Sequence, residues 1–272
     1  MFIYSIWDHI CKDISTKCNT IKVNQILDQS DDTKWIAIKH DVETNVAKAL
    51  ELAKIENKYN LQATYYVQAD LVDENYKLLQ KIKSLGHEVT YHYDVLDANN
   101  GDIDKSIEDF ENNLKKFKKY GFDVSTVCPH GNPVMIRDGW SSNKDFFRYE
   151  KVTNMYLNIL DMVVQLPNKL NYSYTYISDA GYGWKKITNI ENNDIKNDGD
   201  VEIKDYKELI NIINSTDNLI LSTHPHRWEK NSFKFIKNVY VFKILRLVAR
   251  FISKIPILKN IISRYYYLAK KI

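Results

Sequence analysis

Apolar residues along the chain alternate between short continuous runs and longer stretches with helical spacing. Runs such as residues 35–39 and 219–223 have the length and the β-branched content of buried strands. In residues 104–120, by contrast, Ile107, Phe110 and Leu114 recur on one helical face. Strand-like and helix-like segments take turns through most of the chain, and this order predicts parallel βα units.

The individual elements follow from the same periodicities. The predicted strands are residues 35–39, 63–68, 88–93, 124–128, 172–178 and 219–223, and the predicted helices are residues 45–58, 75–84, 104–120 and 205–215. Gly86 is a helix C-cap signal after the second helix. Residues 155–164 fit a helix or a strand. Residues 1–33 are expected to form a helical or irregular lead-in, which offers apolar anchors and no chemistry.

Histidine-containing polar clusters occur at the ends of these predicted strands. His40 with Asp41, His92, His130 and His224 each stand at or just past a strand-like run. The carboxyl ends of parallel strands meet at one face of a barrel-like sheet, and that face is where catalytic side chains gather. Histidine and carboxylate at successive strand ends therefore indicate a metal or acid–base site.

Asp41 and Glu43 are two residues apart, so in extended backbone they project to the same side. One carboxylate can then bind a divalent metal while the other accepts a proton from water. The alternative is structural. Asp41 would cap the following helix, and Glu43 would be a first-turn acid favoured by the helix dipole.

The histidines near residue 90 are not equivalent. His87 and His92 are five residues apart, which sends them to opposite faces of a strand, and His92 beside Tyr93 at the strand end is the better ligand. His130 lies in a turn rich in glycine and proline that fixes its backbone. Its neighbour Cys128 is expected to be a buried small side chain rather than a nucleophile.

A second polar cluster follows the strand at residues 219–223. His224 could protonate a leaving group, with His226 and Arg227 beside it, and Trp228 could form a stacking wall for a sugar ring. Upstream, Asp179 precedes Trp184 in a glycine-containing loop, where the carboxylate could orient a catalytic group or simply start a turn.

Taken in order, these clusters resemble the motifs of the polysaccharide deacetylase family, the NodB-like family 4 carbohydrate esterases, over roughly residues 34–228. The matching segments are I-K-H-D-V-E at residues 38–43 with its separated carboxylates, Gly86-His87-Glu88 with His92, Cys128-Pro129-His130-Gly131, Asp179 with Trp184, and Leu221-Ser222-Thr223-His224. The chain departs from the family pattern in two places. Leu96 stands where a second metal-binding histidine is usual, and the third motif lacks its arginine and has His130 in place of tyrosine.

The resemblance implies an α/β fold, a distorted (β/α)7 barrel, and hydrolysis of an N-acyl or O-acyl group on a carbohydrate with a divalent metal, most often zinc. Asp41 would be the general base and His224 the general acid, and Asp179, which matches the fourth motif, would be a further catalytic residue. Because Leu96 cannot bind a metal, we expect His130 to complete an open three-ligand site with Glu43 and His92.

The resemblance also bears on the substrate and on alternatives. The substrate-contacting residues would be Tyr93, Trp184, His226, Arg227 and Trp228. With its degenerate motifs the chain resembles family members of surface-polysaccharide and lipopolysaccharide biosynthesis, which implies a nucleotide-linked or lipid-linked sugar as the substrate. The departures leave open an inactive barrel that binds a glycan or a partner protein, or a different amide reaction on sugars.

Charge divides the chain into an acidic body and a basic tail. Residues 1–229 hold 27 basic and 35 acidic residues, whereas residues 230–272 hold 11 basic residues and no acidic one. Residues 239–254 place Lys243, Arg246, Arg250 and Lys254 along one face of a predicted helix, and Pro256 ends it before a second segment at residues 257–272. We therefore divide the chain into a lead-in at 1–33, a barrel at 34–228 and a basic amphipathic helical tail at 229–272.

This tail suggests peripheral contact of residues 235–272 with anionic lipid. Alternatively, its apolar face packs on the barrel and its cations are only solvated; nucleic acid is disfavoured, because the acidic body would repel phosphates. No uninterrupted apolar run is long enough for a spanning helix, and residues 1–12 lack the basic start of a secretory signal. With three cysteines and no CxxC pair, these features favour a cytoplasmic location, with membrane association at the inner face.

Overall fold

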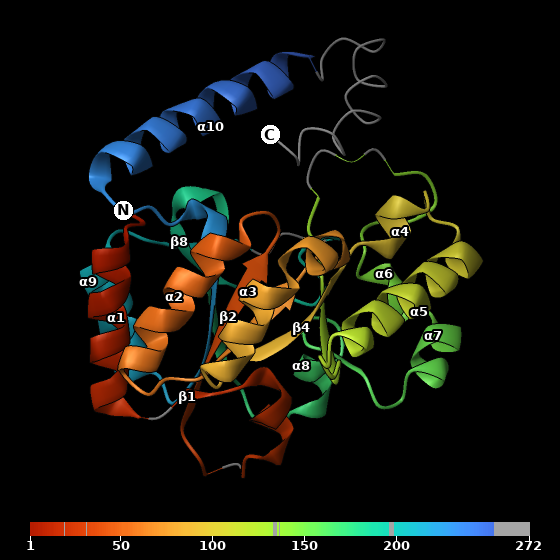
Figure 1. The fold of residues 1–272 in the computed structure, drawn as a ribbon, viewed down its shortest axis with the longest axis horizontal. Helices are drawn as coiled ribbons and strands as arrows, with labels where there is room; N and C mark the ends of the chain where they lie inside the picture. The colour runs from red at the N-terminus through yellow and green to blue at the C-terminus, as the bar shows by residue number, and fades with distance from the viewer. Residues whose placement is uncertain (19, 31, 133–134, 136, 196–198, 253–272) are drawn as a thin grey trace.

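The computed structural model describes residues 1–18, 20–30, 32–132, 135, 137–195 and 199–252, and for residues 245–252 the backbone alone. One ten-stranded sheet organises this part of the chain (Figure 1). The strands are β1 Thr20–Ile21, β2 Trp35–Val42, β3 Ala63–Val67, β4 Glu88–Tyr93, β5 Thr126–Pro129, β6 Leu160–Asp161, β7 Thr175–Ser178, β8 Trp184–Ile187, β9 Val201–Ile203 and β10 Asn218–Thr223.

Seven neighbouring strands of this sheet are parallel. The hydrogen-bonded order is β6-β5-β4-β3-β2-β10-β7-β8-β9, with β1 added to β2, and only β8 and β9 pair antiparallel. The predicted α/β class with parallel strands is therefore confirmed. Among the described residues no ladder joins β6 to β9, so the sheet is open at that seam.

Helices cover the outer side of the sheet. The helices in the described part of the chain are α1 Tyr4–Lys17, α2 Val46–Lys58, α3 Val72–Ser84, α4 Val95–Ala98, α5 Ile103–Lys119, α6 Asp145–Arg148, α7 Glu150–Met155, α8 Leu166–Lys169, α9 Tyr206–Ser215 and α10 Ser232–Ile252, with 3-10 turns η1 Val23–Asp28, η2 Ala69–Leu71, η3 Ala180–Tyr182 and η4 Pro225–Arg227. α9, α1, α2, α3 and α5 pack in succession against one another (Figure 1). Their apolar faces and the outer face of the sheet form the main core.

The lead-in is part of this core. Trp7 and Ile10 on α1 are fully buried, and the Phe2 ring packs edge-on against Trp228 at 5.1 Å between centroids. β1 extends the sheet beside β2. Residues 1–33 therefore contribute hydrophobic burial to the same unit that carries the histidine clusters.

The alternation along β2 decides which side chains face inward. Ala37 belongs to the inner apolar cluster, whereas Ile36 and Ile38 belong to the outer one. The same period of two sends Lys39 and Asp41 inward and His40 outward, toward α2. Because of this alternation, Asp41 lies at the carboxyl end of the sheet, beside the ends of β4, β5 and β10.

Most predicted elements are confirmed to within a few residues, with one clear exception. The segment 155–164 is neither one helix nor one strand, because α7 ends at Met155 and only Leu160–Asp161 join the sheet. β2 also runs on past its predicted end to Val42, so Asp41 lies within the strand.

The tail begins as the helix α10, which lies across the end of the molecule where η3 and η4 are found (Figure 1). It starts earlier than predicted, at Ser232 rather than residue 239. The predicted second segment, residues 257–272, and Lys254 lie outside the described residues. None of the described helices combines the length and the hydropathy that crossing a bilayer requires.

Candidate metal centre and acid–base site

Glu43, His92 and His130 meet at the carboxyl end of the sheet. Glu43 follows β2, His92 is in β4 and His130 follows β5. Glu43 Oε1 lies 3.4 Å from His130 Nε2 and 3.9 Å from His92 Nε2, and one donor atom from each of the three residues falls within 4.8 Å of the others. The structure thus brings together the three residues expected to bind a metal.

The hydrogen bonding of His92 fits a metal ligand. Its Nδ1 donates to the carbonyl of Cys128 at 3.0 Å, so its Nε2 can present a lone pair toward Glu43. That Nε2 is buried and has no hydrogen-bond partner among the described residues. A buried imidazole nitrogen without a partner costs free energy unless a proton donor or a cation meets it. Two imidazoles and one carboxylate are also a donor set that zinc accepts with a fourth position open.

The electrostatics of this cluster favour a cation. Burial works against charge on His92, but the Asp41 and Glu43 carboxylates and the contact with Cys128 together outweigh it and raise the pKa of His92 to about 10. Burial likewise opposes ionisation of Glu43, yet the adjacent imidazoles, those of His130 and His92 foremost, hold the pKa of Glu43 well below its usual range. Two ionised carboxylates in a buried pocket create a negative potential that a divalent ion would neutralise.

His130 is held by a second polar cluster on the loop after β5. Asn143 donates to the carbonyl of His130 at 2.9 Å and to Asp97 at 3.0 Å. Arg137 makes a two-pronged ion pair with Asp97, at 2.8 Å for each contact, and also donates to the carbonyl of Asn132. The loop that carries His130 is therefore tied to the helix α4, which follows the strand of His92.

Asp41 faces the same space and forms an ion pair with Lys39, which precedes it by two residues on β2. Lys39 Nζ lies 2.8 Å from Asp41 Oδ2 and also donates to the hydroxyl of Tyr176 at 3.1 Å. Burial opposes the charge on Asp41, but Lys39 together with His92 and His224 outweighs it, and the pKa of Asp41 is lowered. Asp41 Oδ1 is buried without a partner among the described residues, so one oxygen remains available for a proton. The alternative role of helix cap is wrong, because Asn45 caps α2.

His224 and Asp179 form a dyad on the opposite side of Glu43. Asp179 Oδ1 accepts from His224 Nδ1 at 2.6 Å, and the other oxygen accepts from Thr223 at 2.5 Å and from the backbone of His224 at 2.9 Å. Burial opposes its charge, but Arg227 at 2.7 Å and His224 hold the pKa of Asp179 well below its usual range. The ring is thus fixed with Nε2 directed toward Glu43 Oε1 at 3.7 Å and Asp41 Oδ2 at 3.8 Å.

His226 completes the open side of this space. Its Nδ1 lies 3.8 Å from Glu43 Oε2, and its side chain is 26% exposed, the most of the four histidines here. Burial lowers the pKa of His226 to about 4, so the ring is neutral near pH 7 and can donate or accept one hydrogen bond. Arg227, expected to contact substrate, is instead engaged with Asp179.

Three aromatic residues expected to contact substrate are buried elsewhere. Tyr93 is fully buried and donates to Asp161 at 2.6 Å, so its hydroxyl is committed inside the core. Trp228 is also fully buried and donates to Thr223 at 2.7 Å, and Trp184, 6% exposed, packs on Phe2. Neither indole offers a free face to a sugar ring, so these three assignments are wrong.

His40 and His87 face away from the site, as the strand period predicts. His40 Nε2 lies 2.6 Å from Glu56 Oε1 on α2, and His87 hydrogen-bonds the backbone of Ala53 and Ala63. Cys128 lies between the site and the inner core, where burial raises the pKa of its thiol. A thiol with a raised pKa stays protonated and is a poor nucleophile.

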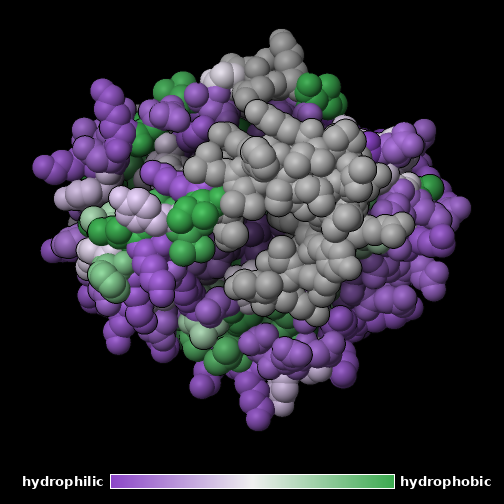
Figure 2. Space-filling view, turned by 90° about the horizontal axis from the view of Figure 1, so that it is seen from above, coloured by the Kyte–Doolittle hydropathy of each residue, from purple (hydrophilic) through white to green (hydrophobic). Residues whose placement is uncertain are grey.

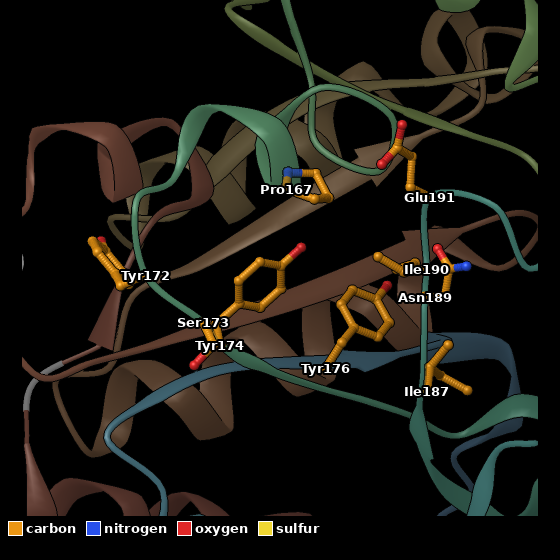
Figure 3. Close-up of a pocket in the computed structure, with 9 residues that line it drawn as sticks. All are labelled: Pro167, Tyr172, Ser173, Tyr174, Tyr176, Ile187, Asn189, Ile190 and Glu191. Carbon is orange, nitrogen blue, oxygen red and sulfur yellow. The ribbon is translucent and has the colours of Figure 1, made fainter. Parts of the chain in front are cut away.

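A cavity of about 260 Å³ lies away from the histidines, between α8 and the strands β7 and β8 (Figure 3). Its lining residues are Pro167, Tyr172, Ser173, Tyr174, Tyr176, Ile187, Asn189, Ile190 and Glu191. The Tyr174 and Tyr176 rings stand side by side along its wall (Figure 3). Tyr176 links the cavity to the site, through Lys39. The lining lacks histidine and aspartate, so the reactive groups are those at the strand ends.

Sequence patterns missed the supporting residues of the site. Lys39 stands in an apolar run, where the only signal of an inward charge is that it lies two residues before Asp41. Asp97, Arg137 and Asn143 are separated by up to 46 residues and have no spacing that would associate them.

The chain matches neither a protein-family model nor a curated protein. Solved structures with a similar chain path include a family 4 esterase from Streptococcus mutans, at 10% identity and a TM-score of 0.45, over 84% of this chain and 88% of that one. A family 4 carbohydrate esterase from Streptomyces lividans, in complex with acetate, is 13% identical with a TM-score of 0.42, over 78% of this chain and 89% of that one.

A family 4 pseudoenzyme from Bacillus anthracis is 12% identical with a TM-score of 0.45, over 79% of this chain. The present chain spans only 63% of that protein's length. All three belong to the family that the sequence motifs resemble. Likenesses this distant assign no activity, substrate or metal to the chain.

Proposed function

We propose that the chain hydrolyses an N-acyl or O-acyl group on a carbohydrate and that a divalent metal, best suited by zinc, is held by Glu43, His92 and His130. One observation carries this proposal. The Glu43 carboxylate lies between the two imidazoles on one side and the His224–Asp179 dyad on the other, within 3.9 Å of each ring. Metal donors, a base and an acid thereby surround one small space.

Each group has a distinct chemical task. A zinc ion, when bound, supplies Lewis-acid polarisation of the acyl carbonyl and acidifies water. Asp41 stays ionised because Lys39 pairs with one of its oxygens, and its unpaired oxygen accepts the proton of the attacking water.

His224 is the proton donor of the proposed reaction. Asp179 accepts from its Nδ1 and fixes the orientation of the ring, while Nε2 points toward the acidic pair Asp41 and Glu43. From this position Nε2 can pass a proton to the leaving amine or hydroxyl of the sugar. Burial of Asp179 keeps water from competing for the dyad.

The carbohydrate as substrate rests on the resemblance of the motifs and not on a sugar-binding surface. His226 is the polar side chain placed at the open side to contact it. We place the substrate among nucleotide-linked or lipid-linked sugars of cell-surface polysaccharide assembly.

Acyl release from a panel of N-acetylated and O-acetylated sugars, measured with zinc-loaded protein, tests the reaction. We expect Asp41→Asn and His224→Ala to lower kcat by about 10²- to 10⁴-fold, the contribution of one positioned acid or base. His9→Ala, at an exposed histidine of α1, is the matched control and should leave kcat unchanged. If the wild type binds zinc and releases no acyl group from any of these sugars, hydrolysis is excluded and a glycan-binding role takes its place.

A further inference from the structure

The helix α10 has one face against the body of the protein. Phe235 and Phe242 on this face contact the Tyr182 ring, at 6.2 and 5.1 Å between centroids, and Phe235 also contacts Phe2 at 6.1 Å. Asn238 on the same side donates to Glu229. The helix therefore packs on the end of the molecule through side chains that leave its opposite face outside.

The opposite face carries an apolar stripe, which we define as Phe233, Ile236, Tyr240 and Ile244. These side chains are 79%, 48%, 64% and 58% exposed, respectively. Their spacing of three, four and four residues puts them on one side of a helix. Figure 2, seen from the side of α10, shows hydrophobic residues at the surface among hydrophilic ones. Bulky apolar side chains gathered in this way mark an interaction surface.

Lysines flank this stripe on both sides. At 100° per residue, Lys237 and Lys234 lie on one flank and Lys243 on the other, and all three are exposed. None of them makes an ion pair with an acidic residue in the part of the chain that the structure describes. The 11 basic residues after Glu229 have no acidic residue among them.

We propose that the outer face of α10 binds the surface of an anionic lipid bilayer, with the stripe inserted at the headgroup level and the lysines meeting lipid phosphates. A helix of this kind lies in the membrane plane, in keeping with the absence of a span-capable helix among those described. The proposal does not depend on the hydrolysis proposed above. It would bring His226, six residues before α10, close to the bilayer.

The charge on the outer face of α10 favours lipid over two other binding partners, a second copy of the chain and a nucleic acid. A second copy of the chain would set one lysine-flanked stripe against another, and the like charges would repel. Nucleic acid would attract the lysines and leave the apolar stripe without a role, while the acidic body would oppose it. An anionic bilayer satisfies both the stripe and the lysines.

Vesicle flotation of the full chain tests this proposal. We expect flotation with phosphatidylcholine vesicles containing about one third phosphatidylglycerol and little with phosphatidylcholine alone. The variant Phe233→Ser/Ile236→Ser/Tyr240→Ser should weaken binding at least about 10-fold, and Lys234→Gln/Lys237→Gln/Lys243→Gln about 100-fold. Leu157→Ser/Ile195→Ser is the matched control, since those residues are 77% and 67% exposed elsewhere and should leave flotation unchanged.

Two results would overturn the proposal. One is flotation of the stripe variant equal to that of the wild type. The other is a wild-type chain that ignores anionic vesicles but sediments as a dimer, which the stripe substitutions convert to a monomer. Equal far-ultraviolet circular dichroism of all variants ensures that either result reflects binding and not folding.

Discussion

Lys39 is a buried cation that the chain places directly beneath its proposed general base. Its side chain is 2% exposed, and its ammonium contacts Asp41, Tyr176 and Ser222. Burying this charge costs free energy, which the ion pair and the two hydroxyl contacts offset. The pair fixes the rotamer of Asp41 and leaves one carboxylate oxygen facing the site. Lys39 is therefore a positioning residue, because it acts on the reaction through Asp41.

Replacing Lys39 tests that role. We expect Lys39→Met to lower kcat about 10- to 100-fold with little change in KM, because the base loses its fixed orientation while the substrate contacts remain. Lys39→Arg should recover part of the loss, since it keeps the charge beside Asp41. The control is Lys34→Met, at a lysine whose ion pair with Asp217 is exposed. A Lys39→Met enzyme with wild-type kcat would rule out positioning by this lysine.

At the residue scale, the position of a residue at the end of a strand predicted the members of the site well, whereas residue type alone predicted them poorly. Asp41, His92 and His224 were predictable because each ends a recognisable strand, and strand ends of a parallel sheet converge. Tyr93 also ends a strand and Trp228 follows the turn η4 after β10, yet both are buried. An aromatic side chain at such a position is equally typical of a hydrophobic core and of a ligand-binding surface, and only tertiary packing decides between the two.

At the element scale, α2 is fastened to its neighbours through one buried carboxylate. Glu56 accepts from Trp7 on α1 at 3.1 Å, contacts His40 on β2 at 2.6 Å and accepts from Tyr65 on β3 at 2.7 Å. Burial opposes its charge, but His40 together with His87 and the Tyr65 hydroxyl outweighs it, and the pKa of Glu56 is lowered. One acidic side chain thus joins a helix–helix contact to a helix–sheet contact.

Substituting Glu56 should destabilise the fold in a pH-dependent way. We expect Glu56→Gln to reduce the free energy of unfolding at pH 7 by roughly 3–5 kcal/mol, the usual cost of breaking a buried pair from one side. Because the folded pKa is depressed, the stabilisation is present above the unfolded value near 4.5 and is lost as pH falls through the folded pKa. The difference between wild type and variant should therefore shrink below pH 4.5.

Urea unfolding at several pH values measures this difference. Glu51→Gln on the same helix is the control, since Glu51 pairs with Lys54 at the exposed surface and should change stability by about 0.5 kcal/mol or less. Equal effects of the two substitutions at pH 7 would contradict the account of Glu56.

Elements whose apolar residues recur with a regular strand or helix period were predictable, and elements without such a period were not. β10 and α5 have the apolar alternation or the helical face that tertiary burial later uses, so their bounds shifted by only one or two residues. Residues 155–164 form a helix end, a turn and a two-residue strand. Pieces this short are fixed by contacts such as that of Asp161 with Tyr93, which no local pattern encodes.

At the scale of the whole molecule, an acidic body carrying the site is joined to a basic helix carrying an exposed apolar stripe. The α/β class followed from the order of strands and helices, because alternating elements fold as parallel units. The open seam of the sheet did not follow, since it depends on pairings between distant strands. Likewise, sequence periodicity could not tell which face of the tail packs on the body. In the described part of the tail it is the face of Phe235 and Phe242, because both rings contact Tyr182.

The central claim is that Glu43, His92 and His130 bind one metal ion, and the stoichiometry of zinc after reconstitution and dialysis tests it most directly. Elemental analysis should find one zinc per wild-type chain and per His9→Ala chain, with the metal largely lost from His92→Ala and His130→Ala. Glu43→Gln should retain weaker binding. Wild-type zinc content in the His130→Ala chain, or none in the wild type after zinc is supplied, would contradict the account.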